Sequence, residues 1–220
     1  MNIIFDLDGT LIDSAPDIQY VANTVLAARN LSPLSLEQTR RFVGEGSSVF
    51  VQRMMAARDL APDPQAFDTL HSEFLQVYES AVERAEFYPG AREALAVLED
   101  AGHNLALCTN KPEAPTHAVL RHMGLNDVFG AVVAGGMLPA RKPEPDMLLR
   151  ANELLGGGAV LYVGDSEIDA RTAQRAGFRF ALYTNGYRKT PVAELYHDFL
   201  FDDFAALPGI VVRCNATYGS

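Results

Sequence analysis

Two aspartates that follow the first apolar run are the residues of this chain whose type and spacing point most clearly to chemistry. Residues 5–11 read FDLDGTL, so Asp6 and Asp8 stand two positions apart, and Gly9 follows them as a residue suited to a tight backbone turn. Two carboxylates placed together can provide a nucleophile, transfer protons or bind a divalent cation. In isolation, such a pair can also be turn or capping residues.

Three more polar groups follow in positions where later apolar runs end. They are Thr109 with Asn110, then Lys142, and finally Asp165 with Asp169. Each group alone has a simple structural interpretation: a residue at the end of a strand, a solvated loop charge, or carboxylates that favour a helix N-terminus. Their order along the chain, after the first aspartate pair, is what makes them informative.

The elements that would position these residues can be predicted from the apolar patterns. Short apolar runs predict buried strands, and helical patterns that end near glycines separate them. Strands that alternate with helices indicate an α/β protein with a parallel sheet covered on both faces. The predicted strands are residues 2–5, 104–108, 131–134, 160–163 and 180–183, and the predicted helices are residues 91–101, 114–123, 146–155 and 167–176. Residues 209–220 show no informative pattern.

A long helical stretch interrupts this alternation. Amphipathic patterns at residues 18–28, 36–42, 49–57 and 66–82 predict helices, and no convincing strand lies among them. Proline and glycine mark both junctions. We therefore predict an inserted all-helical domain over residues 16–85, and a core made of residues 1–15 and 86–220.

The four polar groups, taken in order, resemble the signatures of the haloacid dehalogenase superfamily of phosphatases. This resemblance implies a Rossmann-like three-layer core with strand order 3-2-1-4-5, in which the site lies at the carboxyl ends of the strands. It also implies that Asp6 attacks phosphorus and forms an aspartyl phosphate, and that Asp8 protonates the leaving oxygen and later activates water. The helical insert corresponds to a cap domain.

The resemblance further implies a magnesium site. Asp6, Asp165 and the backbone carbonyl of Asp8 are the implied ligands, and Asp169 is a second-shell residue that orients them. Carboxylates gathered at one rim repel each other by about 4 kcal/mol for a pair near 4 Å at an effective dielectric of 20, so a cation has to offset them. The prediction is therefore a Mg²⁺ cofactor.

Other residues are implied to bind the phosphoryl group. The Thr109 hydroxyl and the Asn110 amide would contact its oxygens, and Lys142 would supply positive charge to them and to Asp6.

The cap resembles that of the phosphoglycolate phosphatase branch. Gly44 and Gly46 in the VGEG segment would let backbone amides approach a small anion, and Arg53 would pair with the substrate carboxylate or support this loop. A simple turn with a surface arginine is the alternative. We predict hydrolysis of 2-phosphoglycolate to glycolate and phosphate. Sugar phosphates, pyrophosphate and a β-phosphoglucomutase-like mutase reaction stay open, whereas Asp8 counts against a dehalogenase.

Composition excludes other classes. The formal net charge of −10 on 220 residues repels polyanions, which argues against nucleic acid or an anionic membrane as the partner. No segment reaches the roughly 18 apolar residues of a membrane span. The two cysteines, Cys108 and Cys214, lack metal-type spacing, and Cys108 is expected to be a buried thiol. We expect a cytoplasmic monomer or homodimer that acts on a small phosphorylated metabolite.

Overall fold

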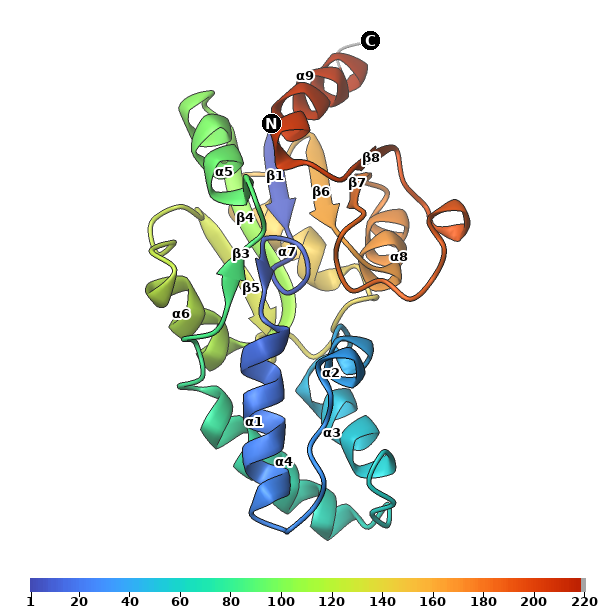
Figure 1. Cartoon of the computed structure of the whole chain (residues 1–220). Coiled ribbons are helices and arrows are strands. Elements are labelled where there is room, and N and C mark those ends of the chain that lie inside the picture. Colours follow the sequence, from blue (N-terminus) through green and yellow to red (C-terminus); the bar gives the residue numbers. More distant parts are fainter. Residues whose placement is uncertain (219–220) are drawn as a thin grey trace.

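A six-stranded parallel sheet forms the centre of the protein in the computed structural model, which describes residues 1–218 (Figure 1). The strand order is β5-β4-β1-β6-β7-β8. The first five of these strands reproduce the predicted order 3-2-1-4-5, and the prediction of an α/β fold is confirmed. The strands are β1 Asn2–Phe5, β4 Asn104–Pro112, β5 Ala131–Gly135, β6 Val160–Gly164, β7 Arg179–Tyr183 and β8 Phe199–Phe201.

Helices cover both faces of this sheet and complete the three layers. α5, α6 and α9 share one hydrophobic cluster with the sheet, and α7 and α8 share the cluster on the other face. Their bounds are α5 Ala91–Asp100, α6 Glu113–His122, α7 Asp146–Leu154, α8 Glu167–Ala176 and α9 Leu207–Tyr218, and two 3₁₀ turns span Val192–Glu194 and Phe204–Ala206. No helix in the described part of the chain is long and apolar enough to cross a membrane.

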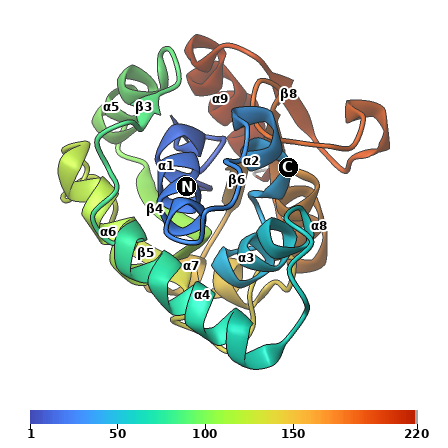
Figure 2. The ribbon, with the colours of Figure 1, turned by 60° about the horizontal axis from the view of Figure 1, so that its bottom comes forward.

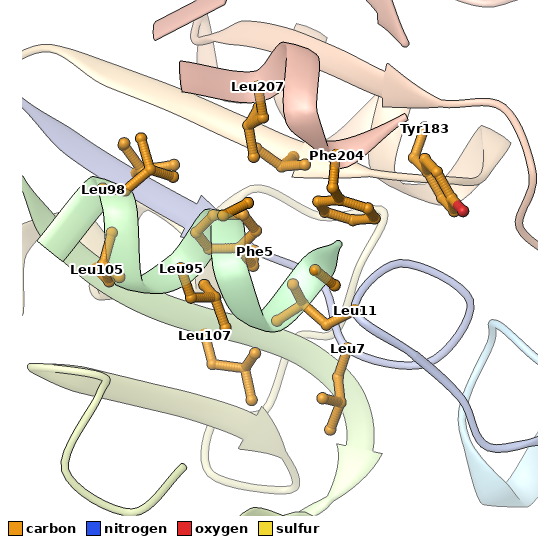
Figure 3. Packing of buried hydrophobic residues seen from close by; sticks show 14 of the residues in the cluster. Phe5, Leu7, Leu11, Leu95, Leu98, Leu105, Leu107, Tyr183, Phe204 and Leu207 are labelled. Carbon is orange, nitrogen blue, oxygen red and sulfur yellow. The ribbon is translucent and has the colours of Figure 1, made fainter. Parts of the chain in front are cut away.

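The alternation of side chains along β1 explains why the central strand is apolar from Ile3 to Phe5. Phe5 packs in the cluster that contains Leu95 and Leu98 of α5, whereas Ile4 points to the opposite cluster (Figure 3). Full burial of such a side chain contributes about 1.5–3 kcal/mol relative to exposure. Burial on both faces therefore fixes the strand whose end carries Asp6.

Two elements at the C-terminal end were not predicted. β8 is a run of only three apolar residues, FLF, at the edge of the sheet, and Leu200 in its middle is 45% exposed. α9 does carry a pattern, since the side chains at positions 207, 210, 211 and 214 are all buried. Pro208 and Gly209 obscured it at its start, where proline is compatible with the first helical turn. The interpretation of this segment as uninformative was wrong.

The cap consists of four helices with a hydrophobic core of their own. Figure 2 views the molecule from the end where these helices come forward. They are α1 Ala15–Ala27, α2 Leu36–Phe42, α3 Ser47–Ala56 and α4 Pro64–Tyr78. Two short antiparallel strands, β2 Ile12–Asp13 and β3 Glu86–Phe87, lie where the chain enters and leaves the cap.

A buried aspartate holds the two crossing segments together. The carboxylate of Asp17, at the start of α1, accepts hydrogen bonds from the backbone N–H groups of Arg84 and Ala85 at 3.0 and 2.9 Å. These amides belong to the segment that returns to the core. The cap is therefore tied to the core at a fixed point close to the end of β1.

Candidate active site

The loop after β1 is built around one carbonyl oxygen. The backbone O of Leu7 accepts hydrogen bonds from the N–H groups of Thr10, Leu11 and Ile12, and the Asp6 N–H donates to the Val163 carbonyl of β6 at 2.9 Å. Gly9, in the middle of the turn, has a φ of 91°, a conformation that favours glycine. The FDLDGTL segment thus directs Asp6 to the sheet end and Asp8 toward the cap.

Three acidic side chains meet at the carboxyl ends of the central strands. Oxygen atoms of Asp6, Asp165 and Asp169 lie within 4.8 Å of one another, and all three residues are buried. The register explains this meeting, because Phe5 of β1 pairs with Val163 of β6, which places Asp6 and Asp165 just beyond neighbouring strand ends. Residues separated by about 160 positions in the sequence are therefore brought together by sheet topology.

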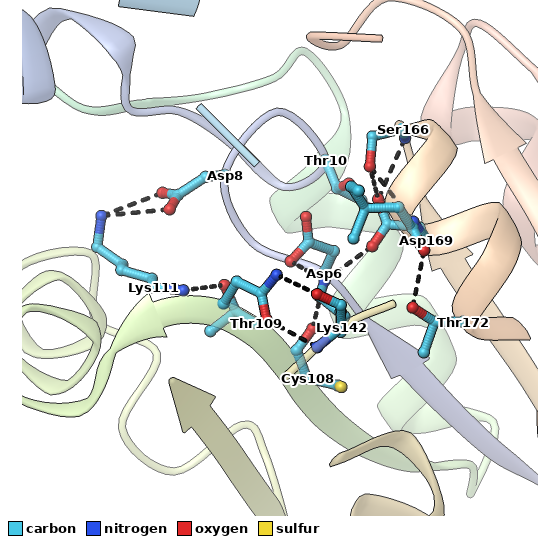
Figure 4. A network of polar contacts seen from close by, with 12 residues as sticks. Asp6, Asp8, Thr10, Cys108, Thr109, Lys111, Lys142, Ser166, Asp169 and Thr172 are labelled. Atoms are coloured by element: carbon cyan, nitrogen blue, oxygen red, sulfur yellow. Dashed lines mark hydrogen bonds and ion pairs between the residues drawn. The ribbon is translucent and has the colours of Figure 1, made fainter. Parts of the chain in front are cut away.

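Lys142 is the cation within this cluster, and only 2% of its surface is exposed. Its Nζ donates to the carboxylates of Asp6 at 2.8 Å and Asp169 at 2.7 Å, and also to the Tyr162 hydroxyl and the Cys108 carbonyl (Figure 4). A solvated loop charge is thus excluded for this lysine. Burial opposes ionisation of Asp169, but Lys142 outweighs it and holds the pKa of that carboxyl below its usual value.

The pKa values of the other two carboxyls, Asp6 and Asp165, shift in the opposite direction. Burial raises the pKa of Asp6 to about 7 although Lys142 opposes the shift, and burial together with the charges of Asp169 and Asp6 raises the pKa of Asp165 well above its usual value. One lysine therefore does not neutralise the cluster. Buried, oxygen-rich and deficient in positive charge, these residues fit a hard divalent cation.

Neighbouring groups fix Asp165 in orientation. One carboxylate oxygen accepts from the Thr10 hydroxyl at 2.8 Å, and the other accepts from the backbone N–H of Tyr187 at 2.6 Å. Asp169 is held in a similar way, since it forms a capping box with Ser166 at the start of α8. Asp169 therefore caps a helix and also binds Lys142.

Gly186 provides a test of this packing. A Cβ at this position would lie 2.3 Å from Cβ of Asp165 and 2.3 Å from the Gly9 carbonyl oxygen. We expect Gly186→Ala to displace Asp165, to lower the free energy of unfolding by about 1–3 kcal/mol, and to raise the Mg²⁺ concentration needed for half-maximal activity. Urea unfolding and a magnesium titration measure these effects. Gly209→Ala, where a Cβ would meet only Arg213 at 3.7 Å, is the control; equal behaviour of the two variants would contradict the prediction.

Asp8 lies apart from the three-carboxylate cluster. Its carboxylate accepts from the Ser14 hydroxyl at 2.6 Å and from Nζ of Lys111 at 3.1 Å. Lys111 is buried and also donates to the Tyr78 hydroxyl at 2.6 Å. Sequence reasoning missed both Lys111 and Tyr78. A signal existed, because the chain contains only three lysines and all three, at positions 111, 142 and 189, line cavities at this site.

Thr109 and Asn110, the residues predicted to bind the phosphoryl group, both line the cavity, but their side chains make different contacts. Thr109 is buried and lines the same cavity as Asp6, and its hydroxyl oxygen accepts from the Lys111 N–H at 3.1 Å. The Asn110 side chain donates to the carbonyls of Gly44 and Lys142 and accepts from the Lys142 N–H, each at 3.0 Å. Its side chain therefore links the cap loop to the Lys142 loop.

The cap residues predicted from the VGEG segment are separated by the structure. Gly44 and Gly46 line the cavity that contains Asp6 and Asp8. Arg53 lines a different groove, where it donates to the Phe42 carbonyl at 3.0 Å and forms an ion pair with Glu45. Of the two interpretations given for Arg53, its contacts match loop support.

The cavity between cap and core is small, about 40 Å³. Since one water needs about 10–15 Å³ on this scale, it holds only a few water-sized groups. Its cap side carries apolar side chains from Ile18, Phe50 and Phe74, and its core side carries the polar residues described above. The arrangement suits a substrate with few atoms.

Together the fold and the site define a class, namely a capped α/β protein with an acidic cation site at the ends of its central parallel strands. The chain belongs to the haloacid dehalogenase-like hydrolases, whose family model matches residues 3–183. This confirms the family predicted from the four separated motifs.

Similar proteins extend over nearly the whole chain. A phosphoglycolate phosphatase of Rhodobacter capsulatus is 48% identical over 209 residues, covering 95% of each chain. A phosphoglycolate phosphatase of Cereibacter sphaeroides is 44% identical and covers 95% of this chain and 96% of its own. The crystal structure of a predicted phosphoglycolate phosphatase from Haemophilus somnus matches with a TM-score of 0.89 at 31% identity, covering 95% of this chain and 96% of that chain.

Proposed function

We propose that this protein is a magnesium-dependent phosphatase that hydrolyses 2-phosphoglycolate to glycolate and phosphate. The observation that carries the proposal is that Asp6 and Asp8 lie in different surroundings. Asp6 lies in the buried acidic cluster beside Lys142, whereas Asp8 lies outside it and faces the cavity from the other side. Relatives that match over nearly the full chain are phosphoglycolate phosphatases, which supports this substrate.

The geometry assigns one step to each aspartate. An oxygen of Asp6 attacks phosphorus and forms a P–O bond, while the bond between phosphorus and the glycolate oxygen breaks. Asp8 donates its proton to the departing oxygen, and it then takes a proton from the water that hydrolyses the aspartyl phosphate. Lys142 holds Asp6 in place and supplies positive charge, and the Thr109 hydroxyl faces the same cavity.

The cation would be held by Asp6, Asp165 and the backbone carbonyl of Asp8, with Asp169 orienting them from behind. Mg²⁺ would offset the negative charge of the phosphoryl oxygens and of the carboxylates that approach them. This assignment rests on the charge deficit of the cluster and on the preference of Mg²⁺ for oxygen ligands.

The cavity disfavours the larger substrates that the sequence left open. The hydroxyl groups of a sugar phosphate would face Ile18, Phe50 and Phe74, and burial of a hydroxyl without a hydrogen bond costs about 1–3 kcal/mol. Among the described residues that line this cavity from the cap, none is a carboxylate. The cap therefore offers no second acid of the kind that a mutase reaction would use.

A substrate panel tests the proposal. We expect phosphate release from 2-phosphoglycolate to show the highest kcat/KM among 2-phosphoglycolate, pyrophosphate and sugar phosphates. We also expect activity to disappear with EDTA and to return with added Mg²⁺. Equal rates on all substrates would remove the assigned substrate, and full activity in EDTA would remove the magnesium site.

A further inference from the structure

Lys111 is the second buried cation of the site, and it lies on the side where the leaving group must depart. Its Nζ is 3.1 Å from Asp8, the residue assigned to protonate the leaving oxygen. Figure 4 shows Lys111 with Asp8 on one side of Asp6, and Asp169 on the other. A group that touches Lys111 is thus part of the alcohol portion of the substrate rather than of the phosphoryl portion.

The contacts of Lys111 leave one donor at this corner without a partner in the described part of the chain, the hydroxyl proton of Tyr78. A lysine ammonium has three N–H donors, and Nζ of Lys111 contacts the two carboxylate oxygens of Asp8 at 3.1 and 3.5 Å and the Tyr78 hydroxyl at 2.6 Å. Because an ammonium cannot accept, the Tyr78 oxygen is the acceptor in that bond. No acceptor for the Tyr78 hydroxyl proton is found among the described residues.

Buried donors in native proteins almost always have partners. Tyr78 is only 4% exposed, and both Tyr78 and Lys111 line the cavity. Burial raises the pKa of Tyr78, so the hydroxyl keeps its proton and remains a donor. Lys111 is held as the partner of a carboxylate, since its Nζ forms an ion pair with Asp8 at 3.1 Å. The corner therefore presents a cation and a hydroxyl proton to whatever occupies the cavity.

The start of α3 adds to the preference for an anion. α3, a helix of ten residues, begins beside the cavity, and its N-cap residue Gly46 and first residue Ser47 both line it. Gly46 provides no side-chain cap for the first amides of the helix. A helix N-terminus favours negative charge. The apolar rings of Phe50 and Phe74 close the rest of this end and leave little room for a longer chain.

We propose that Lys111 and Tyr78 bind the carboxylate of the substrate, so that the enzyme selects phosphomonoesters of short hydroxy acids. This inference rests on the proposed phosphatase function and names the specificity determinant of the same site. It replaces Arg53 as the carboxylate partner, since Arg53 forms an ion pair with Glu45 and lines another groove.

The test compares two substrates that differ only at the carboxylate. In 2-hydroxyethyl phosphate, a hydroxymethyl group takes the place of the carboxylate of 2-phosphoglycolate. Tyr78→Phe keeps the ring that packs on Phe74 and removes only the hydroxyl. We expect this change to lower the kcat/KM ratio of 2-phosphoglycolate to 2-hydroxyethyl phosphate by about tenfold, the size of one lost hydrogen bond to a charged group.

Two further variants complete the design. Lys111→Gln is expected to reduce the kcat/KM ratio of the two substrates at least as much. It provides a second measurement if the Tyr78 variant folds poorly. Tyr20→Phe changes a tyrosine on the exposed side of α1, and the ratio is expected to stay at the wild-type value.

The possible outcomes are separable. If wild type prefers 2-phosphoglycolate and both variants keep that preference while losing activity on the two substrates equally, Lys111 and Tyr78 serve only the structure or the position of Asp8, and the inference is overturned. If wild type shows metal-dependent turnover without any preference, the proposed substrate is wrong, and the carboxylate site falls with it. A ratio reduced in both variants but not in Tyr20→Phe supports the site.

Discussion

Replacement of Asp6 by Asn is expected to lower kcat for phosphate release by a factor of about 10⁴ or more, which is the scale of effect seen when a catalytic nucleophile is removed. Asn has nearly the same shape, but its amide oxygen carries no charge to attack phosphorus. The residue lies within hydrogen-bond distance of Lys142, and the amide oxygen can still accept that bond at the 2.8 Å seen here. The loss would therefore be chemical rather than structural.

Asp100→Asn is the matched control, because Asp100 is an exposed aspartate at the end of α5. It is expected to keep wild-type kcat under saturating 2-phosphoglycolate and Mg²⁺. Circular dichroism and urea unfolding of the Asp6 variant are expected to show a folded protein. Residual activity above about one hundredth of wild type, measured on protein free of contaminating phosphatase, would show that Asp6 is not the nucleophile.

Replacement of Lys142 by Met is expected to lower the free energy of unfolding by about 3–5 kcal/mol, because it leaves two buried carboxylates without their cation. Lys142 contacts both Asp6 and Asp169. Since Lys142 keeps the pKa of Asp169 below the ordinary 3.8, this contribution is present above that pH and is lost as pH falls through the lowered pKa. The measurement is urea unfolding near pH 8 in EDTA.

A second substitution distinguishes the loss of charge from the loss of packing as the cause of the lower stability. Adding Asp169→Asn to the Lys142→Met variant removes one of the unpaired charges and is expected to recover part of the lost stability. Lys189→Met is the control, since Lys189 is exposed and its Nζ donates to the Val43 carbonyl at 3.3 Å rather than to a buried carboxylate. A loss below about 1 kcal/mol in Lys142→Met, or no recovery in the double variant, would contradict the assignment of Lys142 as the cation of the cluster.

Most of the sheet could be predicted because its strands are buried on both faces. β1 and β6 are continuous apolar runs, and each is followed at once by an aspartate, so the pattern gives both the strand and the end that carries the site. The order of the strands came from resemblance to the family. β8 was not found in this way, because its apolar run FLF is only three residues long.

The positions of the site residues on the core could be predicted for the same reason, whereas the contacts on the cap side could not. Asp6 and Asp165 lie just past the ends of β1 and β6, and Thr109 lies in the last part of β4, so the sheet topology brings them together. Tyr78 reaches the cavity only through the packing of α4 against the other cap helices, and no local pattern encodes that contact. Lys111 was overlooked although it follows Asn110 directly.

Asp6 as the residue that is esterified is the central claim, and trapping the intermediate tests it most directly. The enzyme would be mixed with 2-phosphoglycolate and Mg²⁺, quenched and treated with borohydride, which reduces an aspartyl phosphate to homoserine. Mass spectrometry of the peptide that contains residues 2–13 then locates the change. We predict homoserine at position 6, and none when substrate or Mg²⁺ is omitted. Reduction at position 8, or at another aspartate with position 6 unmodified during active turnover, would contradict the account.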